Sequence, residues 1–290
     1  MANLKEIRTR ISSVKSTMQI TSAMKMVSAA KLRKAQQAIT QLRPYANKIN
    51  EILTSVSESL SENKDNPYLE DRKVEKVLLV AISSNRGLCG AFNSNIIKKT
   101  LSVAKEYESK EIDAENIHIL GFGKKAYEIL AKNNYKIIDK NSEIFNELNY
   151  KNVAEYANKI MDLFKNKKYD KVELIYNGFK NAATQILTVE QLLPIKLPEK
   201  TSIKADYIVE PSLKGISNTL VPKSIIIQLL KAIMDSHASE HGARMISMHK
   251  ATDNAGDLIR ELNLTYNKAR QASITSEILE IVGGAEALNN

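Results

Sequence analysis

Three side chains have the types and spacing of a zinc-dependent hydrolase site. They are His237, Glu240 and His241, which match the H-x-x-E-H pattern of inverted zinc peptidases. On a helix, histidines four positions apart share one face, as two zinc ligands should. Both histidines also fall on an apolar helical seam, and the chain holds no second zinc motif. We therefore predict that the pair belongs to the seam, and that the chain binds no metal and no cofactor.

A second candidate is the segment Gly121–Ala126 (GFGKKA), which echoes the dinucleotide-binding fingerprint G-x-G-x-x-G/A. The segment follows an expected strand and opens an expected helix, but this strand is the second in the chain and not the first. A tight strand-to-helix turn is therefore the favoured interpretation. A nucleotide-using enzyme built on this region stays as an alternative.

The polar turn at residues 83–93 (SSNRGLCGAFN) follows the first expected strand, where α/β sheets usually bind ligands. Arg86 could bind an anion, and Cys89 could act as a nucleophile if a base such as His118 lay close to it. Turn geometry is the simpler explanation for Gly87 and Gly90, because glycine adopts turn conformations that other residues avoid.

The elements that would position these residues form an α/β pattern over residues 74–211, preceded by a polar linker at residues 61–73. The run Val74–Ile82 is short and continuously apolar, as in a strand buried on both faces. Strands alternating with helices predict a mostly parallel, Rossmann-like sheet covered by helices. Strands are expected at 74–82, 117–121, 135–138, 172–176 and 185–193, and helices at 92–109, 124–132 and 153–164.

Both ends of the chain carry apolar seams at alternating steps of three and four residues. Fourteen of seventeen such positions from Leu4 to Leu60 are apolar, as are eleven of sixteen from Ile227 to Leu279. This spacing predicts helices over residues 1–60 and 212–290 that form a long antiparallel coiled coil around the inserted domain. Pro44 is expected to bend the first helix without ending it.

Polar residues break both seams. If the inserted domain brings residues 60 and 212 together, residue 25 lies opposite roughly residue 245, so the breaks are expected to face each other. The second helix is also longer, which leaves an overhang at about residues 270–290 that either frays or is surrounded by something else. The breaks are Thr21, Lys25 and Ser28 in the first seam and His237, His241 and Arg244 in the second.

The net charge of +9 is concentrated in residues 1–60, where ten Lys and Arg face three Glu. The positive charge of a basic helix can face solvent, bind nucleic acid or bind an acidic protein surface. Tyr45 is the only aromatic residue before position 61, which weakens the nucleic-acid interpretation and leaves it as an alternative. The single cysteine excludes a disulfide framework, and no apolar run is long enough to span a membrane.

Five stretches of the sequence resemble the gamma subunit of F-type ATP synthase, of the bacterial type. The resemblance covers the whole chain in order, and stretches of this length at both ends are specific. They are ITSAMKMVSAAKLRKAQ at 20–36, RPYA at 43–46, NRGLCGAFN at 85–93, ARMISMHKATDNAG at 243–256 and KARQASITSEILEIVGGAEAL at 268–288.

The resemblance implies a rotor shaft with no catalytic site of its own, at the cytoplasmic face of the bacterial cell membrane. Its overhang would sit inside the hexamer of alpha and beta subunits, and its globular foot would rest on the membrane c-ring and bind the epsilon subunit, with no role for nucleic acid. Positions matching the family's contacts with beta subunits are Arg270, Gln271, Thr275, Met24, Arg244 and Lys25, and those matching its c-ring contacts are Tyr207 and Glu210.

Overall fold

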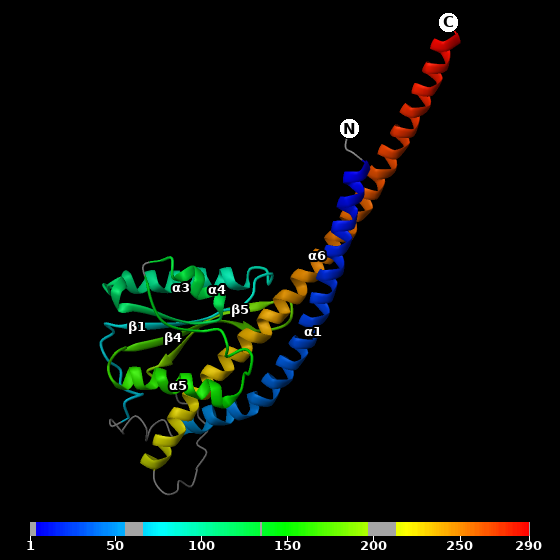
Figure 1. Cartoon of the computed structure of the whole chain (residues 1–290). Helices are drawn as coiled ribbons and strands as arrows, with labels where there is room; N and C mark the ends of the chain where they lie inside the picture. The colour runs from blue at the N-terminus through cyan, green and yellow to red at the C-terminus, as the bar shows by residue number, and fades with distance from the viewer. Residues whose placement is uncertain (1–3, 56–65, 134, 197–212, 290) are drawn as a thin grey trace. The chain divides into compact units, whose positions relative to one another are not determined.

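The computed structural model describes residues 4–55, 66–133, 135–196 and 213–289 (Figure 1). Each helix and strand predicted between residues 74 and 200 is present, with its ends moved by a few residues. In chain order the elements are α1 (Leu4–Ser55), β1 (Val77–Ile82), α3 (Phe92–Glu108), the 3₁₀ turn η1 (Ala114–Asn116), β2 (Ile117–Phe122), α4 (Lys124–Leu130), β3 (Lys136–Asn141), α5 (Tyr150–Lys165), β4 (Lys171–Phe179), β5 (Gln185–Leu193) and α6 (Leu213–Asn289).

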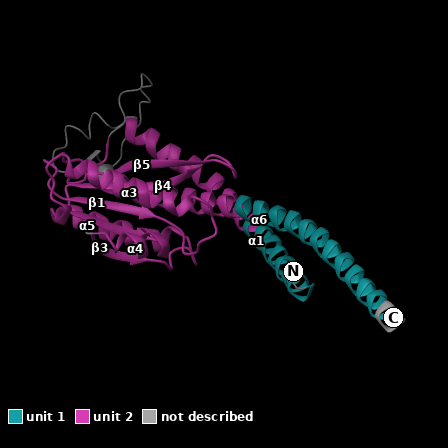
Figure 2. Cartoon of the chain, turned by 90° about the horizontal axis from the view of Figure 1, so that it is seen from above, with its two compact units in different colours: residues 1–28, 245–290 teal, residues 29–244 magenta. Residues whose placement is uncertain are grey.

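The chain divides into two compact units (Figure 2). Unit 1 consists of residues 1–28 and 245–290, and unit 2 of residues 29–244. Helices α1 and α6 each contribute to both units, and each continues through its proline, Pro44 or Pro222. The domain boundaries predicted after residues 60 and 211 lie outside the described residues.

Unit 2 is built on a five-stranded sheet in the order β3-β2-β1-β4-β5. The first four strands are parallel and β5 is antiparallel to β4, which confirms the mostly parallel sheet. Every residue of β1 is buried, because this central strand is covered on both faces. In Figure 1, α3 and α4 lie on one face of the sheet and α5 lies on the other.

Alternate side chains of β1 enter two separate cores, as the two-residue period of a strand requires. Val77, Leu79 and Ala81 pack with residues of α3 and α4. Leu78, Val80 and Ile82 pack with α5 and with the segments of α1 and α6 that belong to unit 2. The two long helices therefore complete the core of the α/β unit as well as pairing with each other. Their core residues include Ala46, Ile49 and Leu53 of α1 and Val221, Ile225, Leu229 and Ile233 of α6.

Unit 1 is an antiparallel pair formed by the first residues of α1 and the last part of α6. Thr21 and Thr252 share a hydrogen bond of 2.9 Å between their hydroxyls, and Arg8 Nη2 donates to the Tyr266 hydroxyl at 2.7 Å. The seams account for this packing: every described seam position of α1 from Leu4 to Leu53 is buried or half-buried. The predicted coiled coil is confirmed.

The predicted register was wrong by one helical turn. Lys25 Nζ lies 3.2 Å from His249 Nδ1, four residues beyond the expected position 245. Thr21 and Lys25 therefore meet Thr252 and His249 and not the predicted breaks of the second seam, and His237 contacts Phe145 in the loop after β3. A seam repeats along its helix, so its spacing identifies the buried face but does not determine the offset between partners.

Helix α6 remains helical to Asn289 and extends beyond the start of α1 in unit 1 (Figure 1). Its seam is buried or half-buried up to Leu262, and from Asn263 onward most side chains are exposed. The predicted overhang, defined here as residues 270–289, is thus a single helix, and the side chains described in it, those of residues 270–285, are mostly exposed.

Candidate functional site

Three of the predicted contact residues, Arg270, Gln271 and Thr275, lie together on the overhang, and all three are exposed. The Thr275 hydroxyl donates to the backbone carbonyl of Gln271 at 3.0 Å, one turn earlier in the helix. The side-chain amide of Gln271 and the guanidinium of Arg270 are exposed on the same stretch of helix. The overhang can therefore donate hydrogen bonds from these side chains to a protein that surrounds it.

The overhang also exposes five large apolar side chains. Their exposed fractions run from 43% to 72%. Residues at positions 274, 278 and 281 repeat at the spacing of one helix face, and 282 adjoins them. Water solvates such a stripe poorly, and contiguous exposed apolar surface marks an interaction site. The five are Ile274, Ile278, Leu279, Ile281 and Val282.

Met24 and Lys25 lie on α1, well away from the overhang. Met24 is half-buried, and its carbonyl accepts a 2.7 Å hydrogen bond from the Ser28 hydroxyl. His249, the partner of Lys25, is 21 positions before Arg270 on α6, which corresponds to roughly 30 Å along the helix axis. The structure therefore does not bring Met24 and Lys25 together with the overhang residues.

Arg244 is buried in unit 2, and both terminal nitrogens of its guanidinium have partners there. Its Nη1 lies 2.6 Å from Glu240 Oε1 in a buried ion pair. Its Nη2 donates to the backbone carbonyls of Arg86 and Gly87 at 3.0 and 3.3 Å. Sequence comparison suggested a contact with another subunit, and the periodicity gave no sign that this side chain reaches the turn after β1.

The turn after β1 lies at the position where an open α/β sheet of this kind binds ligands, next to the change of direction in strand order between β1 and β4. Helix α6 occupies that position. The Ser236 hydroxyl donates to the Ile82 carbonyl at 3.3 Å, and a Cβ atom at Gly242 would lie 3.0 Å from the Ala182 carbonyl oxygen. Phosphate-binding turns present backbone N–H groups to the ligand. This turn instead presents its backbone carbonyls to the guanidinium of Arg244. The arrangement argues against a nucleotide site here.

Gly123 makes a tight turn, as predicted for the glycine-bearing segment after β2. Its φ is +90°, and a Cβ atom there would lie 2.2 Å from the Ser83 carbonyl oxygen. The Ser83 hydroxyl accepts a 2.9 Å hydrogen bond from the Ala126 N–H at the start of α4. Gly90 has a positive φ of 59°, as a turn glycine can adopt, but Gly87 does not. The other residue of this turn with a positive φ is Leu88, at 63°.

Cys89 and His118 do not meet. Cys89 is buried after the carboxyl end of β1, and burial is the largest of the effects that raise the pKa of its thiol. His118 pairs in register with Leu78 near the opposite end of the strands, and its Nδ1 lies 2.6 Å from the Tyr169 hydroxyl. The possibility that Cys89 and His118 form a catalytic pair is therefore wrong, because the two side chains lie at opposite ends of the parallel strands.

His237 and His241 pack against each other with their Nε2 atoms 3.1 Å apart. Phe145 stacks on His237 with ring centroids 5.7 Å apart. Burial chiefly lowers the pKa of His237 to about 4 and that of His241 to about 3. His237 lowers the pKa of His241 further, and Lys31 and Arg244 lower both. Glu240 binds Arg244, so the three residues do not converge. Within the described ranges, no group of three or more His, Cys, Asp or Glu side chains could hold a metal ion.

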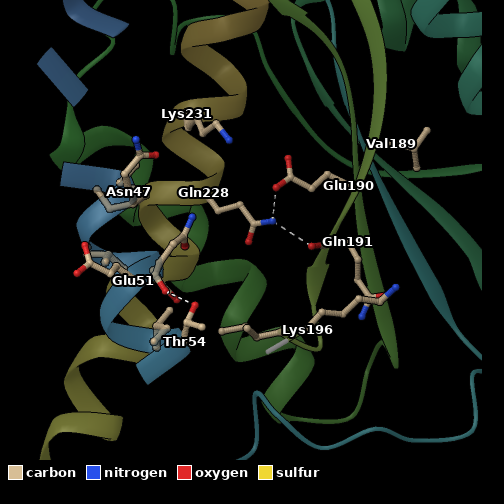
Figure 3. A pocket seen from close by; sticks show the side chains of 16 residues that line it. Asn47, Glu51, Thr54, Val189, Glu190, Gln191, Lys196, Gln228 and Lys231 are labelled. Carbon is tan, nitrogen blue, oxygen red and sulfur yellow. Dashed lines mark hydrogen bonds between the residues drawn. The ribbon is translucent and has the colours of Figure 1, made fainter. Parts of the chain in front are cut away.

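A cavity of about 730 Å³ opens between α1, β5 and α6 in unit 2 (Figure 3). Gln228 crosses it, and its Nε2 donates to Glu190 Oε1 at 2.8 Å and to the Gln191 carbonyl at 3.0 Å. Acidic and basic side chains line the cavity together, including Glu51 and Lys231. Because side chains of both charges line the cavity, its electrostatics favour neither an anionic nor a cationic ligand.

The two predicted foot contacts, Tyr207 and Glu210, lie outside the described residues. Of the helices that the structure describes, none has the length and apolar character needed to cross a membrane.

Comparison with known proteins gives a consistent result over the whole chain. A family model described as ATP synthase matches residues 3–288. The ATP synthase gamma chain of Flavobacterium johnsoniae is 58% identical, and that of Christiangramia forsetii is 57% identical, with both chains covered completely in each case. Among solved structures, a chain of the Tetrahymena thermophila mitochondrial ATP synthase central stalk and c-ring is 26% identical with a TM-score of 0.59, covering 80% of this chain and 99% of that one. A chain of the Euglena gracilis mitochondrial ATP synthase is 21% identical, has a TM-score of 0.66, covers 98% of this chain and 94% of that one, and supports the fold.

Proposed function

This chain belongs to the ATP synthase gamma-chain family, and from that premise we propose that it is the central rotor shaft of an F-type ATP synthase. It couples ion-driven rotation of the membrane c-ring to conformational change in the catalytic beta subunits, and so to ATP synthesis or hydrolysis. The observation that carries the proposal is the overhang: a helix with exposed apolar and polar side chains, which a surrounding protein must cover.

The overhang is the part of the shaft that the alpha and beta subunits enclose. Arg270, Gln271 and Thr275 lie on its exposed surface, where they can donate hydrogen bonds to a beta-subunit loop. Rotation presents different faces of the helix to three beta subunits in turn. Because only a difference in affinity between two conformations can shift their populations, these contacts must differ between open and closed beta subunits.

The first helix forms a second contact region, near the lower rim of the beta subunits. Residues 1–60 carry an excess of seven positive charges, which complements an acidic beta-subunit surface. Met24 and Lys25 lie in this region, beside the exposed apolar residues Met26 and Val27. Arg244 is buried in unit 2, so an effect of this position on the beta subunits passes through the turn after β1, which its side chain holds.

The α/β unit is the foot of the rotor and contacts the epsilon subunit and the c-ring, the latter through Tyr207 and Glu210. The chain is attached to the membrane only through the complex, at the cytoplasmic face of the cell membrane. It has no catalytic site, cofactor or nucleic-acid ligand of its own. Helix α6 in the ligand position of the sheet supports this, because it leaves no place for a nucleotide there.

Two experiments test the proposal. In a native pull-down, the tagged chain should recover alpha and beta subunits, and their absence would refute the rotor function. In the assembled enzyme, Arg270→Ala and Gln271→Ala should lower ATP turnover while leaving the amount of incorporated chain unchanged. Lys98→Ala, an exposed residue of α3, serves as the matched control. Turnover equal to the control would show that the two overhang residues make no productive contact.

A further inference from the structure

The segment Ser236–Arg244 of α6 makes directional contacts with the α/β unit that differ in kind from the apolar packing before it. From Val221 to Ile233 the helix contributes side chains to the hydrophobic core. Apolar contact is non-directional, so by itself it tolerates a small rotation of a helix about its axis. Hydrogen bonds and ion pairs lose strength steeply when their angles change.

Three contacts distribute this segment across different loops of the sheet. Ser236 donates to the Ile82 carbonyl at the end of β1, and Arg244 donates to the Arg86 and Gly87 carbonyls in the turn that follows. Between them, Gly242 packs directly against Ala182 in the turn between β4 and β5. A Cβ atom at this position would lie 3.0 Å from the Ala182 carbonyl oxygen, so a residue with a small side chain fits only if this contact gives by a few tenths of an ångström.

The turn that receives Arg244 is itself held firmly. The Ser84 hydroxyl donates to the Arg86 carbonyl at 2.7 Å, and the Ser84 N–H donates to Asn93 Oδ1 at 3.0 Å. Asn85 Nδ2 donates to the Ser142 carbonyl at 2.6 Å, and Asn85 Oδ1 accepts from the Lys124 N–H at 3.1 Å. The guanidinium therefore binds to a turn that is anchored to α3, to the loop after β3 and to the start of α4.

The Glu240–Arg244 pair sets the direction of the guanidinium. The two side chains are one helical turn apart and both are about nine-tenths buried. Glu240 occupies Nη1, which leaves Nη2 directed at the two carbonyls. A buried charge-assisted pair of this kind is stronger and more exact in geometry than a neutral hydrogen bond.

We propose that Ser236–Arg244 is a torsional key that locks the rotation of α6 to the α/β unit, with Arg244 as its main positioning residue. The proposal rests on the rotor function above. Torque applied to the foot reaches α6 through the key, and α6 continues as one helix into the residues of unit 1. This role assigns Arg244 to transmission within the chain and does not require it to touch a beta subunit.

The test uses the whole ATP synthase, with Arg244→Gln in the chain. Torsional stiffness is measured from the angular fluctuations of a probe fixed to the foot while the alpha and beta subunits are held. Coupling is measured as ATP-driven ion transport per ATP hydrolysed. We expect a loss of stiffness and a lower coupling ratio. Glu240→Gln, which leaves Arg244 in place but frees its direction, should give a smaller loss of the same kind.

A covalent replacement separates this proposal from a direct contact with beta subunits. Because an ideal Cβ at position 242 lies 3.2 Å from the Ala182 Cα, cysteines introduced at Gly242 and Ala182 are close enough for a disulfide. The native Cys89 is 1% exposed and does not compete. In the Arg244→Gln background, oxidation of this cysteine pair should restore stiffness and coupling, and reduction should remove both again.

The outcomes are distinct. If Arg244→Gln assembles with unchanged stiffness, or if its defect persists after the disulfide forms, the key is refuted, since a lost beta-subunit contact cannot be repaired between residues 242 and 182. If the wild-type chain does not assemble with alpha and beta subunits, the rotor function fails first. The oxidised cysteine pair with Arg244 intact is the control, and it should retain wild-type stiffness.

Discussion

Replacing His241 with glutamine should reduce the acid sensitivity of the folded chain. His241 is 5% exposed, and burial, with a smaller contribution from His237, lowers its pKa to about 3 from the usual value of about 6.5. The folded state therefore holds it neutral, whereas the unfolded chain protonates it below pH 6.5. The stabilisation is complete above that pH and is lost progressively as the pH falls toward the folded value.

The expected magnitude follows from proton linkage. About a quarter of the unfolded imidazole is protonated at pH 7 and nearly all of it at pH 5, whereas the folded imidazole stays neutral at both. Integrating that difference gives a loss of about 2 kcal/mol between pH 7 and pH 5 from this one side chain. Burial raises the pKa of Glu240 and Asp235, so these two carboxyls stabilise the folded chain as the pH falls. Because both remain in His241→Gln, they do not contribute to the difference between wild type and variant.

The assay is urea unfolding at pH 7 and pH 5, followed by the reactivity of Cys89 toward a thiol reagent active at both values. Cys89 is the only cysteine of the chain and lies buried in unit 2, so its labelling reports the unfolding of that unit. Wild-type protein should lose about 2 kcal/mol more than His241→Gln on acidification, which shifts the midpoint by roughly 1 M urea.

His249→Gln is the control, because this histidine is exposed on unit 1 and should leave the difference unchanged. Equal losses in wild type and His241→Gln would show that the folded chain can protonate this imidazole without cost, and the reasoning from burial would fail.

Three further changes test the packing. Gly123→Ala should lower the melting temperature sharply or prevent accumulation of folded chain, because its Cβ would overlap the Ser83 carbonyl at positive φ; a near-wild-type melt would contradict the turn geometry. Ile39→Ala removes a seam side chain that is 4% exposed and should cost about 2–5 kcal/mol in urea unfolding, against a negligible cost for the exposed neighbour Thr40→Ala. Leu279→Asp, on the exposed overhang, should change the stability of the free chain by less than about 0.5 kcal/mol yet weaken its binding to alpha and beta subunits, and unchanged binding would argue that nothing packs on that residue.

Sequence periodicity predicted most of this fold because each element has a clear physical period. The apolar run that became β1 is buried on both faces, and the seams of α1 and α6 point to their partners. Offsets between elements were less predictable. The Lys25–His249 contact differs from the expected register by one turn, since shifting one helix by a turn still leaves apolar residues facing each other.

The proposed contact residues come from the resemblance and not from a physical pattern in the sequence. Exposed Arg270 and Gln271 have no periodic signature, because side chains on a solvated helix are not constrained by their own chain. Arg244 was the opposite case: its polar character in a seam signalled something unusual, but its carbonyl partners lie more than 150 positions earlier. Contacts over such separations depend on the finished topology, which local spacing does not encode.

The pairing of the first and last helices has a consequence for biogenesis. Thr21 and its partner Thr252 are 231 positions apart. At ribosomal speeds of about 5–20 residues per second, α1 emerges roughly 10–50 s before the segment that covers its seam. During that interval an amphipathic helix is exposed, and the core of the α/β unit still lacks its α6 residues. Folding of both units must therefore wait until almost all of the chain has been made, so protection by chaperones during synthesis should matter more for this chain than for one with local contacts.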